Sequence, residues 1–321
     1  MTTKREQQVI AIEEHYWDAE VSAQLSAADA GGPPAIRERL EDLGALRIKE
    51  MDEAGIDVQV LSHAPPATQR MEAEKSVALS IGANDRLAAF VASQPDRFAA
   101  FATLPTPDPK ASADELERTV TQHGFKGAMI HGLTDGVFPD DKRYWPVFER
   151  AAALDVPIYI HPAMPHPAVV DAYYKEYIED FPGFLTAGWG FTVETATAGI
   201  RIVLSGLLDA YPNTKVILGH MGEGIPFLLW RIDSALSRPG NKPLSFRDAF
   251  SEHFYITTSG NFSDPALLCS IQEMGVDRIL FSVDYPFVLN PPGVEWIESV
   301  HLNNEDKDKI LHGNAKRLLK L

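Results

Sequence analysis

Ile158-Tyr159-Ile160-His161-Pro162 is a short apolar run that ends in a histidine and is followed by a proline. β-Branched and aromatic residues favour a strand, and the proline cannot donate a hydrogen bond to a sheet, so we expect the strand to end at His161. Val216-Ile217-Leu218-Gly219-His220 repeats the pattern, again with a histidine at the last position. Both runs indicate buried strands that carry a polar side chain at the C-terminal end.

Eight runs of this kind alternate with longer helical patterns along the chain. The strand-like runs cover residues 9–13, 58–61, 98–104, 127–130, 157–161, 216–220, 254–258 and 279–282. The helical patterns cover residues 35–54, 73–94, 111–122, 145–154, 194–210 and 306–319. This alternation is expected of repeated βα units in a parallel sheet, and eight units predict one closed (β/α)₈ TIM barrel.

We expect residues 1–321 to form this barrel as a single domain, because such barrels commonly exceed about 250 residues. A doubly wound open sheet is the alternative fold. It would normally carry a glycine-rich phosphate turn after the first strand. The corresponding stretch, Glu13-Glu14-His15-Tyr16-Trp17, contains no glycine.

The composition is that of a globular protein and excludes several functional classes. Hydrophobic residues make up 45% of the 321 residues and charged residues 23%. The net charge of −16 argues against binding to nucleic acid or to an anionic membrane surface. Cys269 is the only cysteine, so no intramolecular disulfide can form, and we expect a reducing cytoplasm.

Two connections are too long to be simple turns. One follows the first strand and runs through Gly31-Gly32-Pro33-Pro34, and the other runs from Pro162 to about Thr192. Both begin at the C-terminal end of a strand, where barrel enzymes build their active sites. We expect these segments to form lids or subunit contacts.

Metal-ligand residue types gather at the ends of four predicted strands. Alternation along a strand places Glu13 and His15 on the same side. His161 and His220 end the fifth and sixth strands, and Asp284 follows the eighth. Each residue alone is explained as an ordinary polar side chain at a strand end, but a barrel brings these ends around one mouth. Carboxylate and imidazole donors suit Zn²⁺, Mn²⁺ or Fe²⁺.

Several motifs are shared with a known family. They are Glu13-X-His15, His161-Pro162, Gly219-His220-Met221-Gly222-Glu223, Thr257-Thr258-Ser259-Gly260-Asn261-Phe262 and Phe281-Ser282-X-Asp284-X-Pro286. The chain resembles the amidohydrolase-2 branch of the amidohydrolase superfamily, and within it the γ-resorcylate, 2,3-dihydroxybenzoate and salicylate decarboxylases. The resemblance covers almost the whole chain.

The resemblance implies a set of site residues. Glu13, His15, His161 and Asp284 would hold one divalent ion, Mn²⁺ or Zn²⁺, without an organic cofactor. Hydrolytic members usually open with His-X-His and often use a strand-4 lysine to bridge two metals, whereas this chain has Glu13 and, after the fourth strand, His131. A single metal follows from that difference.

The remaining roles also come from the resemblance. Asp284, His220 and Glu223 would handle protons, with Asp284 delivering one to the ring. Arg231 would pair with the carboxylates, and its alternative is a helix-surface salt bridge. The substrate-binding candidates are Trp189, Phe191, His63, His131 and Arg231.

The implied reaction is decarboxylation of an ortho-hydroxylated aromatic acid by a homodimer or homotetramer. His131 stands where relatives tend to carry asparagine, and His63 where they carry a hydroxyl, amide or apolar residue, so we expect different ring substituents. One alternative is metal-dependent hydrolysis of an amide or lactone. Another is a catalytically silent barrel that serves as a binding protein.

Overall fold

The computed structural model describes residues 7–26, 29 and 32–321. Its strands all pair in parallel, in the orders β1-β2-β3 and β4-β5-β6-β7-β8-β9. The strands are β1 (Ile10–Tyr16), β2 (Val58–His63), β3 (Phe98–Ala100), β4 (Ala102–Thr103), β5 (Ala128–His131), β6 (Ile158–His161), β7 (Val216–Leu218), β8 (Phe254–Thr257) and β9 (Ile279–Leu280). β3 and β4 are the two halves of one predicted strand.

The two sheets join into a closed barrel. At the junction of β3 and β4, the amide of Phe101 donates to the carbonyl of Leu61 on β2 at 2.9 Å. At the other seam, the segment after β9 pairs with β1 through a parallel bridge between Glu14 and Tyr285. The amide of His15 donates to the carbonyl of Tyr285 at 2.7 Å. The predicted (β/α)₈ TIM barrel is therefore confirmed, whereas one domain over residues 1–321 stays a prediction.

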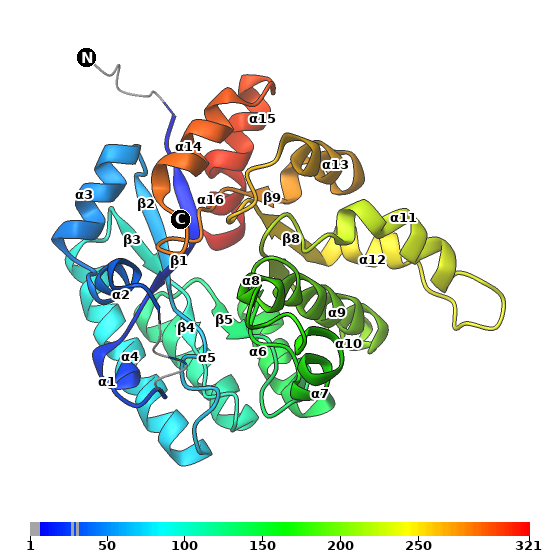
Figure 1. The fold of residues 1–321 in the computed structure, drawn as a ribbon, viewed down its shortest axis with the longest axis horizontal. Helices are drawn as coiled ribbons and strands as arrows, with labels where there is room; N and C mark the ends of the chain where they lie inside the picture. Colours follow the sequence, from blue (N-terminus) through cyan, green and yellow to red (C-terminus); the bar gives the residue numbers. More distant parts are fainter. Residues whose placement is uncertain (1–6, 27–28, 30–31) are drawn as a thin grey trace.

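Helices surround the strands (Figure 1). The longer ones are α2 (Pro34–Glu41), α3 (Ala45–Ala54), α4 (Ala73–Ser93), α5 (Pro109–His123), α6 (Trp145–Leu154), α9 (Gly190–Leu204), α11 (Ile225–Leu236), α12 (Phe246–His253), α13 (Asp264–Met274), α14 (Asn290–Ser299) and α16 (Asn314–Leu319). The shorter ones are α1 (Ala19–Ser22), α7 (Pro167–Val169), α8 (Pro182–Leu185), α10 (Leu207–Ala210), α15 (Asn304–Asp308), η1 (Lys142–Tyr144), η2 (Val170–Tyr174), η3 (Val276–Arg278) and η4 (Lys309–Gly313). No helix among the described residues is long and apolar enough to cross a membrane.

Two predicted helices are each interrupted. The predicted helix over residues 35–54 splits into α2 and α3, because Asp42 takes an extended conformation and Gly44 precedes the second helix. The predicted helix over residues 194–210 begins earlier, at Gly190, and breaks at Gly206, whose φ of +84° is left-handed. In both cases the apolar pattern continues across the break and hides it.

The barrel interior is filled by one cluster of alternate strand side chains, which includes Ile12, Phe101, Met129 and Ile217. Leu318 of α16 packs against this cluster. Other side chains of the same strands, such as those of Ala11 and Ile158, pack with the surrounding helices. The polar residues at the strand ends therefore lie above an apolar, close-packed interior.

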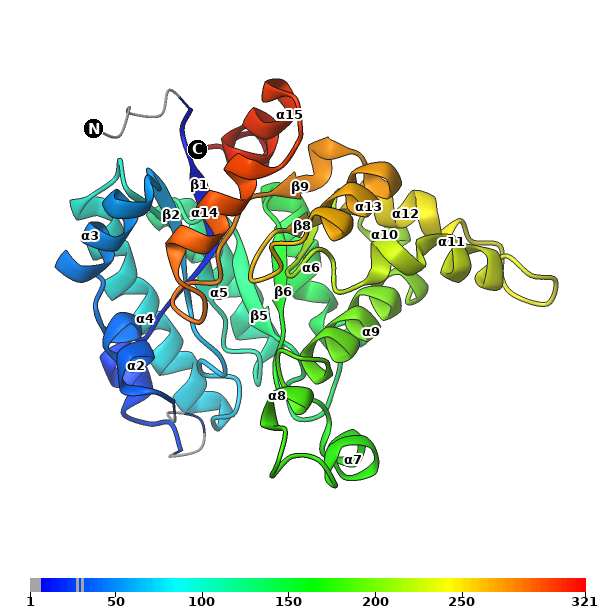
Figure 2. The same ribbon diagram turned by 45° about the horizontal axis from the view of Figure 1, so that its top comes forward.

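Both long connections contain short helices. The first carries α1 and α2, although Gly31 of the quoted motif lies outside the described residues. The second carries α7, η2 and α8 before α9 begins. Figure 2 shows α7 and α8 together at one edge of the molecule, below α9.

Candidate metal and active site

Four side chains from two strands and a loop converge at the mouth of the barrel. Glu13 and His15 come from β1, His161 from the end of β6, and Asp284 from the segment after β9. One ligand atom from each residue lies within 4.8 Å of the others. His15 Nε2 is 3.3 Å from Asp284 Oδ1, and His161 Nε2 is 3.3 Å from Glu13 Oε1. The structure thus brings together the four ligands that the sequence predicts.

A register shift in β1 turns Glu13 and His15 inward. Ile10 and Ile12 belong to the interior cluster, so strict alternation would aim Glu14 into the barrel instead. Between Ala11 and Glu14, however, β1 advances by three residues while β2 advances by two. Such a bulge re-aims the side chains that follow it. The bulge therefore lets Glu13 and His15 share the barrel mouth with His161.

Hydrogen bonds orient each imidazole. The Nδ1–H of His161 donates to the carbonyl of Pro162 at 2.7 Å, which leaves Nε2 with a free lone pair. His15 Nδ1 lies 3.1 Å from Ser62 Oγ, which leaves its Nε2 free as well. A metal-binding histidine commonly uses its second nitrogen in this way. The His161 ring is therefore fixed in the tautomer that a metal requires, and the Ser62 hydroxyl allows His15 the same tautomer.

Three hydroxyl groups surround one oxygen of Glu13. Tyr159 and Ser259 donate to Oε2 in short contacts, and Thr257 donates at 3.2 Å. Gly219 lies against the same carboxylate, where an added Cβ would stand 3.1 Å from Oε2. Oε1 is left free on the side that faces His161.

The donor set fits one divalent cation. Glu13 Oε1, His15 Nε2 and Asp284 Oδ1 are buried without a hydrogen-bond partner, which is costly unless another group binds them. Burial raises the pKa of Glu13, and a bound cation would oppose that shift. The described part of the chain contains no second cluster of three or more such ligands. Two carboxylates and two imidazoles therefore offer one site for Mn²⁺ or Zn²⁺.

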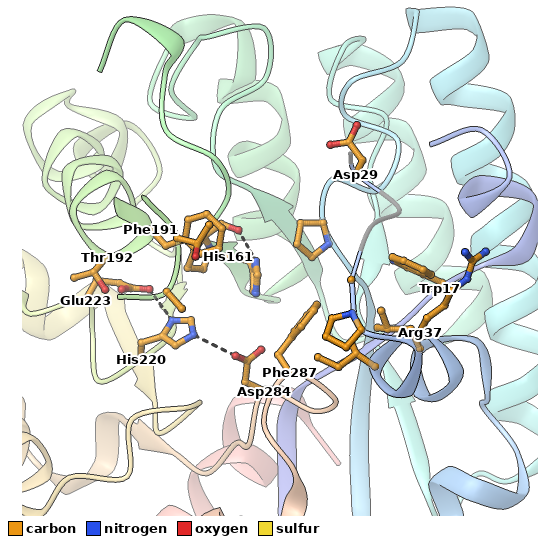
Figure 3. Close-up of a pocket in the computed structure, with 18 residues that line it drawn as sticks. Trp17, Asp29, Arg37, His161, Phe191, Thr192, His220, Glu223, Asp284 and Phe287 are labelled. Carbon is orange, nitrogen blue, oxygen red and sulfur yellow. Dashed lines mark hydrogen bonds and ion pairs between the residues drawn. The ribbon is translucent and has the colours of Figure 1, made fainter. Parts of the chain in front are cut away.

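His220 lies between two carboxylates beside this site, as Figure 3 shows. Its Nδ1 is 2.8 Å from Glu223 Oε1, and its Nε2 is 3.7 Å from Asp284 Oδ2. Burial lowers the pKa of His220, but Glu223 and Glu13 outweigh it and raise that pKa well above the usual value. Burial raises the pKa of Asp284, but the neighbouring His15 and His220 side chains outweigh it and lower that pKa. The two carboxylates therefore favour the protonated form of the His220 imidazole.

The turn that presents His220 is strained. His220, Met221 and Glu223 have φ values of +51°, +58° and +56°, in the left-handed region that residues other than glycine seldom adopt. Backbone strain of this kind concentrates at functional sites. Here it places the imidazole and Glu223 on the same side of one short turn.

A cavity of about 440 Å³ opens beside these groups, a volume suited to a small molecule. His161, His220 and Asp284 line its polar side, while Phe191 and Phe287 supply aromatic rings. Both long connections contribute walls, at residues 32–40 and 186–192. This placement agrees with the expectation that the two segments form lids over the site.

The remaining predicted substrate-binding residues occupy different places. Trp189 is 52% exposed and does not line the cavity, unlike Phe191 two residues later. The expected pairing of Arg231 with the site carboxylates is not found among the described residues, because α11 directs this arginine to the surface. His63 and His131 are buried behind the lining residues, and the His131 ring lies 5.1 Å from that of His161.

Sequence reasoning did not single out the hydroxyl groups that orient the ligands. Tyr159 lies two residues before His161, and Ser259 two residues after Thr257, so alternation puts each pair on one face. Ser62 pairs in register with His15 across β1 and β2. A search for polar residues spaced by two from each ligand would have found Tyr159, whereas Ser62 required the register.

Residues 10–321 match the family described as Amidohydrolase, so the chain belongs to this family. It is 40% identical over 332 residues to gamma-resorcylate decarboxylase of Polaromonas sp. strain JS666, covering 97% of this chain and 98% of that relative. The crystal structure of 2,6-dihydroxybenzoate decarboxylase complexed with 2,6-dihydroxybenzoate is similar, with a TM-score of 0.90 and 38% identity over 98% of this chain and 100% of that one.

A second similar structure contains a metal. It is dihydroxybenzoic acid decarboxylase from Polaromonas sp. JS666 with bound manganese and the inhibitor 2-nitroresorcinol. Its TM-score is 0.90, with 40% identity over 98% of this chain and 97% of that one. These comparisons confirm the predicted resemblance to metal-dependent decarboxylases of dihydroxybenzoates.

Proposed function

We propose that this protein is a carboxy-lyase that removes CO₂, without oxidation, from an ortho-hydroxylated aromatic acid. One observation carries the proposal: the unpartnered atoms of Glu13, His15 and Asp284 lie next to a cavity with aromatic walls. A planar acid fits such a cavity with its ring against Phe191 and Phe287 and its carboxylate toward the ligands. The similarity to dihydroxybenzoate decarboxylases supports the same chemistry.

Glu13, His15, His161 and Asp284 hold the metal ion in this proposal. When bound there, a divalent ion would supply Lewis acidity toward an anionic oxygen substituent of the ring. The protein contributes the hydroxyl groups around Glu13, which keep one of its oxygens directed at the site. The apolar barrel interior below has a low dielectric constant, which strengthens these electrostatic interactions.

The proton path begins at His220. Glu223 holds the imidazolium through Nδ1, and Nε2 faces Asp284 Oδ2. We infer that His220 passes its proton to Asp284, which delivers it to the ring carbon that bears the carboxylate. Cleavage of the bond between that carbon and the carboxylate then releases CO₂, and the bonding pair restores the aromatic ring. In this inference Asp284 acts as a relay for the proton of His220.

His63 and His131 form part of the proposal as determinants of the ring substituents. The Nδ1–H of His63 donates to the carbonyl of Ala64 at 2.8 Å, so the buried, unpartnered Nε2 is an acceptor. Nδ1 of His131 is likewise buried without a partner. We propose that these two unpartnered ring nitrogens favour substrates with a polar ring substituent on their side of the cavity. The variant His131→Asn, the residue typical of relatives, should shift the order of preferred hydroxybenzoates, and an unchanged order would contradict this role.

We also propose that the protein works as a homo-oligomer in the cytoplasm. Phe227 and Trp230 of α11 are 80% and 71% exposed, and α11 projects from the body of the molecule (Figure 1). Exposed apolar patches of this kind commonly mark subunit contacts. The single thiol of Cys269 is consistent with a reducing compartment. Light scattering of the purified protein tests the assembly, and a monomer would contradict it.

The activity is tested with the manganese-loaded protein and two substrate panels. We expect CO₂ and the corresponding phenol from at least one ortho-hydroxybenzoate, and no hydrolysis of lactones or amides. In deuterated water, the product should carry one deuterium at the former carboxyl-bearing carbon. Hydrolysis without CO₂ release would overturn the proposal in favour of a hydrolase, and binding without turnover would favour a silent barrel.

A further inference from the structure

Glu14 is a fully buried acidic residue that lies between two metal-site residues in the sequence and faces away from them. Burial raises the pKa of Glu14 to about 8, and the hydrogen bonds that it accepts from Val283, Ser282 and Tyr285 oppose that shift. Neither its sequence position nor the proposed chemistry assigns it a role. Its surroundings are formed by the segment after β9, which carries Asp284. The side chain therefore connects the first strand of the barrel to the last ligand.

The carboxylate of Glu14 accepts hydrogen bonds from both residues that flank Asp284. Oε1 accepts from the amide of Val283 at 3.0 Å, and Oε2 accepts from the amide of Tyr285 at 3.1 Å. Oε1 also accepts from Ser282 Oγ at 3.0 Å. That hydroxyl is oriented as a donor, because its oxygen accepts from the amide of Glu13 at 2.6 Å.

The backbone at Asp284 needs such support. Its φ of +76° lies in the left-handed region, which costs about 1–2 kcal/mol for a residue other than glycine. Its own amide donates to the carbonyl of Glu13 at 3.1 Å. The turn is thus held against β1 from both sides, with Glu13 and His15 on the metal side and Glu14 on the other.

We propose that Glu14 is a positioning residue that fixes the 282–285 turn, so that the Asp284 carboxylate meets Glu13 and His15 at the geometry a metal ion requires. It touches neither the metal site nor the substrate cavity. The two side-chain oxygens of Glu14 accept from three donors of this turn, and these hydrogen bonds include none in which Glu14 donates. A carboxylate is the one side chain of this length that accepts at both ends.

The test is the variant Glu14→Gln, which keeps the shape but replaces one acceptor by an NH₂ donor. In either orientation of the amide, a donor then faces a donor in a buried place, so the turn relaxes. We expect the dissociation constant for Mn²⁺ to rise about 10- to 100-fold, the usual effect of removing a group that orients a ligand. Isothermal titration with Mn²⁺ alone measures it, and the electron paramagnetic resonance spectrum of the bound ion should change.

Tyr285→Phe is the matched control. Tyr285 belongs to the same turn, and this variant removes the 2.8 Å hydrogen bond from its hydroxyl to Glu50 of α3. It keeps the backbone amide of residue 285 that donates to Glu14. Both variants should lower the melting temperature of the metal-free protein, whereas Glu14→Gln alone should weaken Mn²⁺ binding. Equal affinities in wild type and Glu14→Gln, or an equal loss in Tyr285→Phe, would overturn the proposal.

If Glu14→Gln does not fold, the Mn²⁺ affinity of the variant Ser282→Ala tests the proposal instead. It removes one of the three donors to Glu14 and should weaken Mn²⁺ binding by less than tenfold but measurably. An unchanged dissociation constant in that variant would also overturn the proposal. These measurements use no substrate, so they stand apart from the decarboxylase assignment.

Discussion

Replacement of Asp284 by asparagine separates proton transfer from metal binding. Asp284 presents Oδ1 to the metal site, 3.3 Å from His15 Nε2, and Oδ2 to His220 Nε2 at 3.7 Å. An asparagine can keep a neutral oxygen toward the metal and then turns its NH₂ group toward the imidazolium. A donor faces a donor there, and an amide cannot relay a proton at neutral pH. Because the amide oxygen can still face the metal, the metal content should fall only in part.

The rate should fall far more than the metal content. Loss of general acid catalysis typically lowers turnover by about 10²- to 10⁴-fold. At about 1.36 kcal/mol per tenfold, that corresponds to roughly 3–5 kcal/mol in the barrier. The variant also weakens the contact that holds His220, so the loss should reach at least this range.

The assay measures CO₂ release by metal-saturated protein at the substrate concentration that saturates the wild type. Mass spectrometry of the product formed in deuterated water follows the transferred proton. Asp209→Asn, a change at an exposed residue of α10, is the control and should keep wild-type turnover. A metal-loaded Asp284→Asn protein that works at near wild-type rate would refute the relay and leave His220 as the direct acid.

Three further predictions follow from the site and its surroundings. Elemental analysis should find one divalent ion per chain, and chelation should abolish CO₂ release, whereas two tightly bound ions would contradict the single ligand cluster. Phe191→Ala should raise KM for aromatic acids by about 2- to 10-fold through lost ring contact. Trp189→Ala should change KM less, and an equal rise would place Trp189 on the substrate. Burial lowers the pKa of His63 from 6.5 to about 4. Because the folded state keeps this ring neutral, stability is full above pH 6.5 and falls by up to about 3 kcal/mol as the pH drops to 4. Denaturant unfolding of the metal-free proteins measures the free energy of unfolding at each pH. Between pH 6.5 and pH 4 this free energy should fall less in His63→Gln than in the wild type, whereas the control His301→Gln, changed at an exposed residue, should behave like the wild type. The same pH dependence in His63→Gln and in the wild type would exclude this effect.

The sequence alone predicted the barrel and the four candidate metal ligands that the structure brings together. Apolar runs that end in His161 and His220 define where strands stop, since strand periodicity and proline act over a few neighbouring residues. The order of eight such runs fixes the fold class, because parallel strands bring all their C-terminal ends to one mouth. The shared motifs then identify the family.

Only the tertiary structure decided how these residues face one another. Alternation from Ile12 aims Glu14 into the barrel, and the register shift against β2, which depends on a strand over forty residues away, turns Glu13 and His15 inward instead. The exposure of Arg231 and the break at Gly206 likewise depend on where whole helices pack. The contact between Glu14 and the turn at Asp284 joins residues about 270 positions apart. A local pattern specifies which side chains share a strand face, but long-range packing sets the register and the orientation of each face.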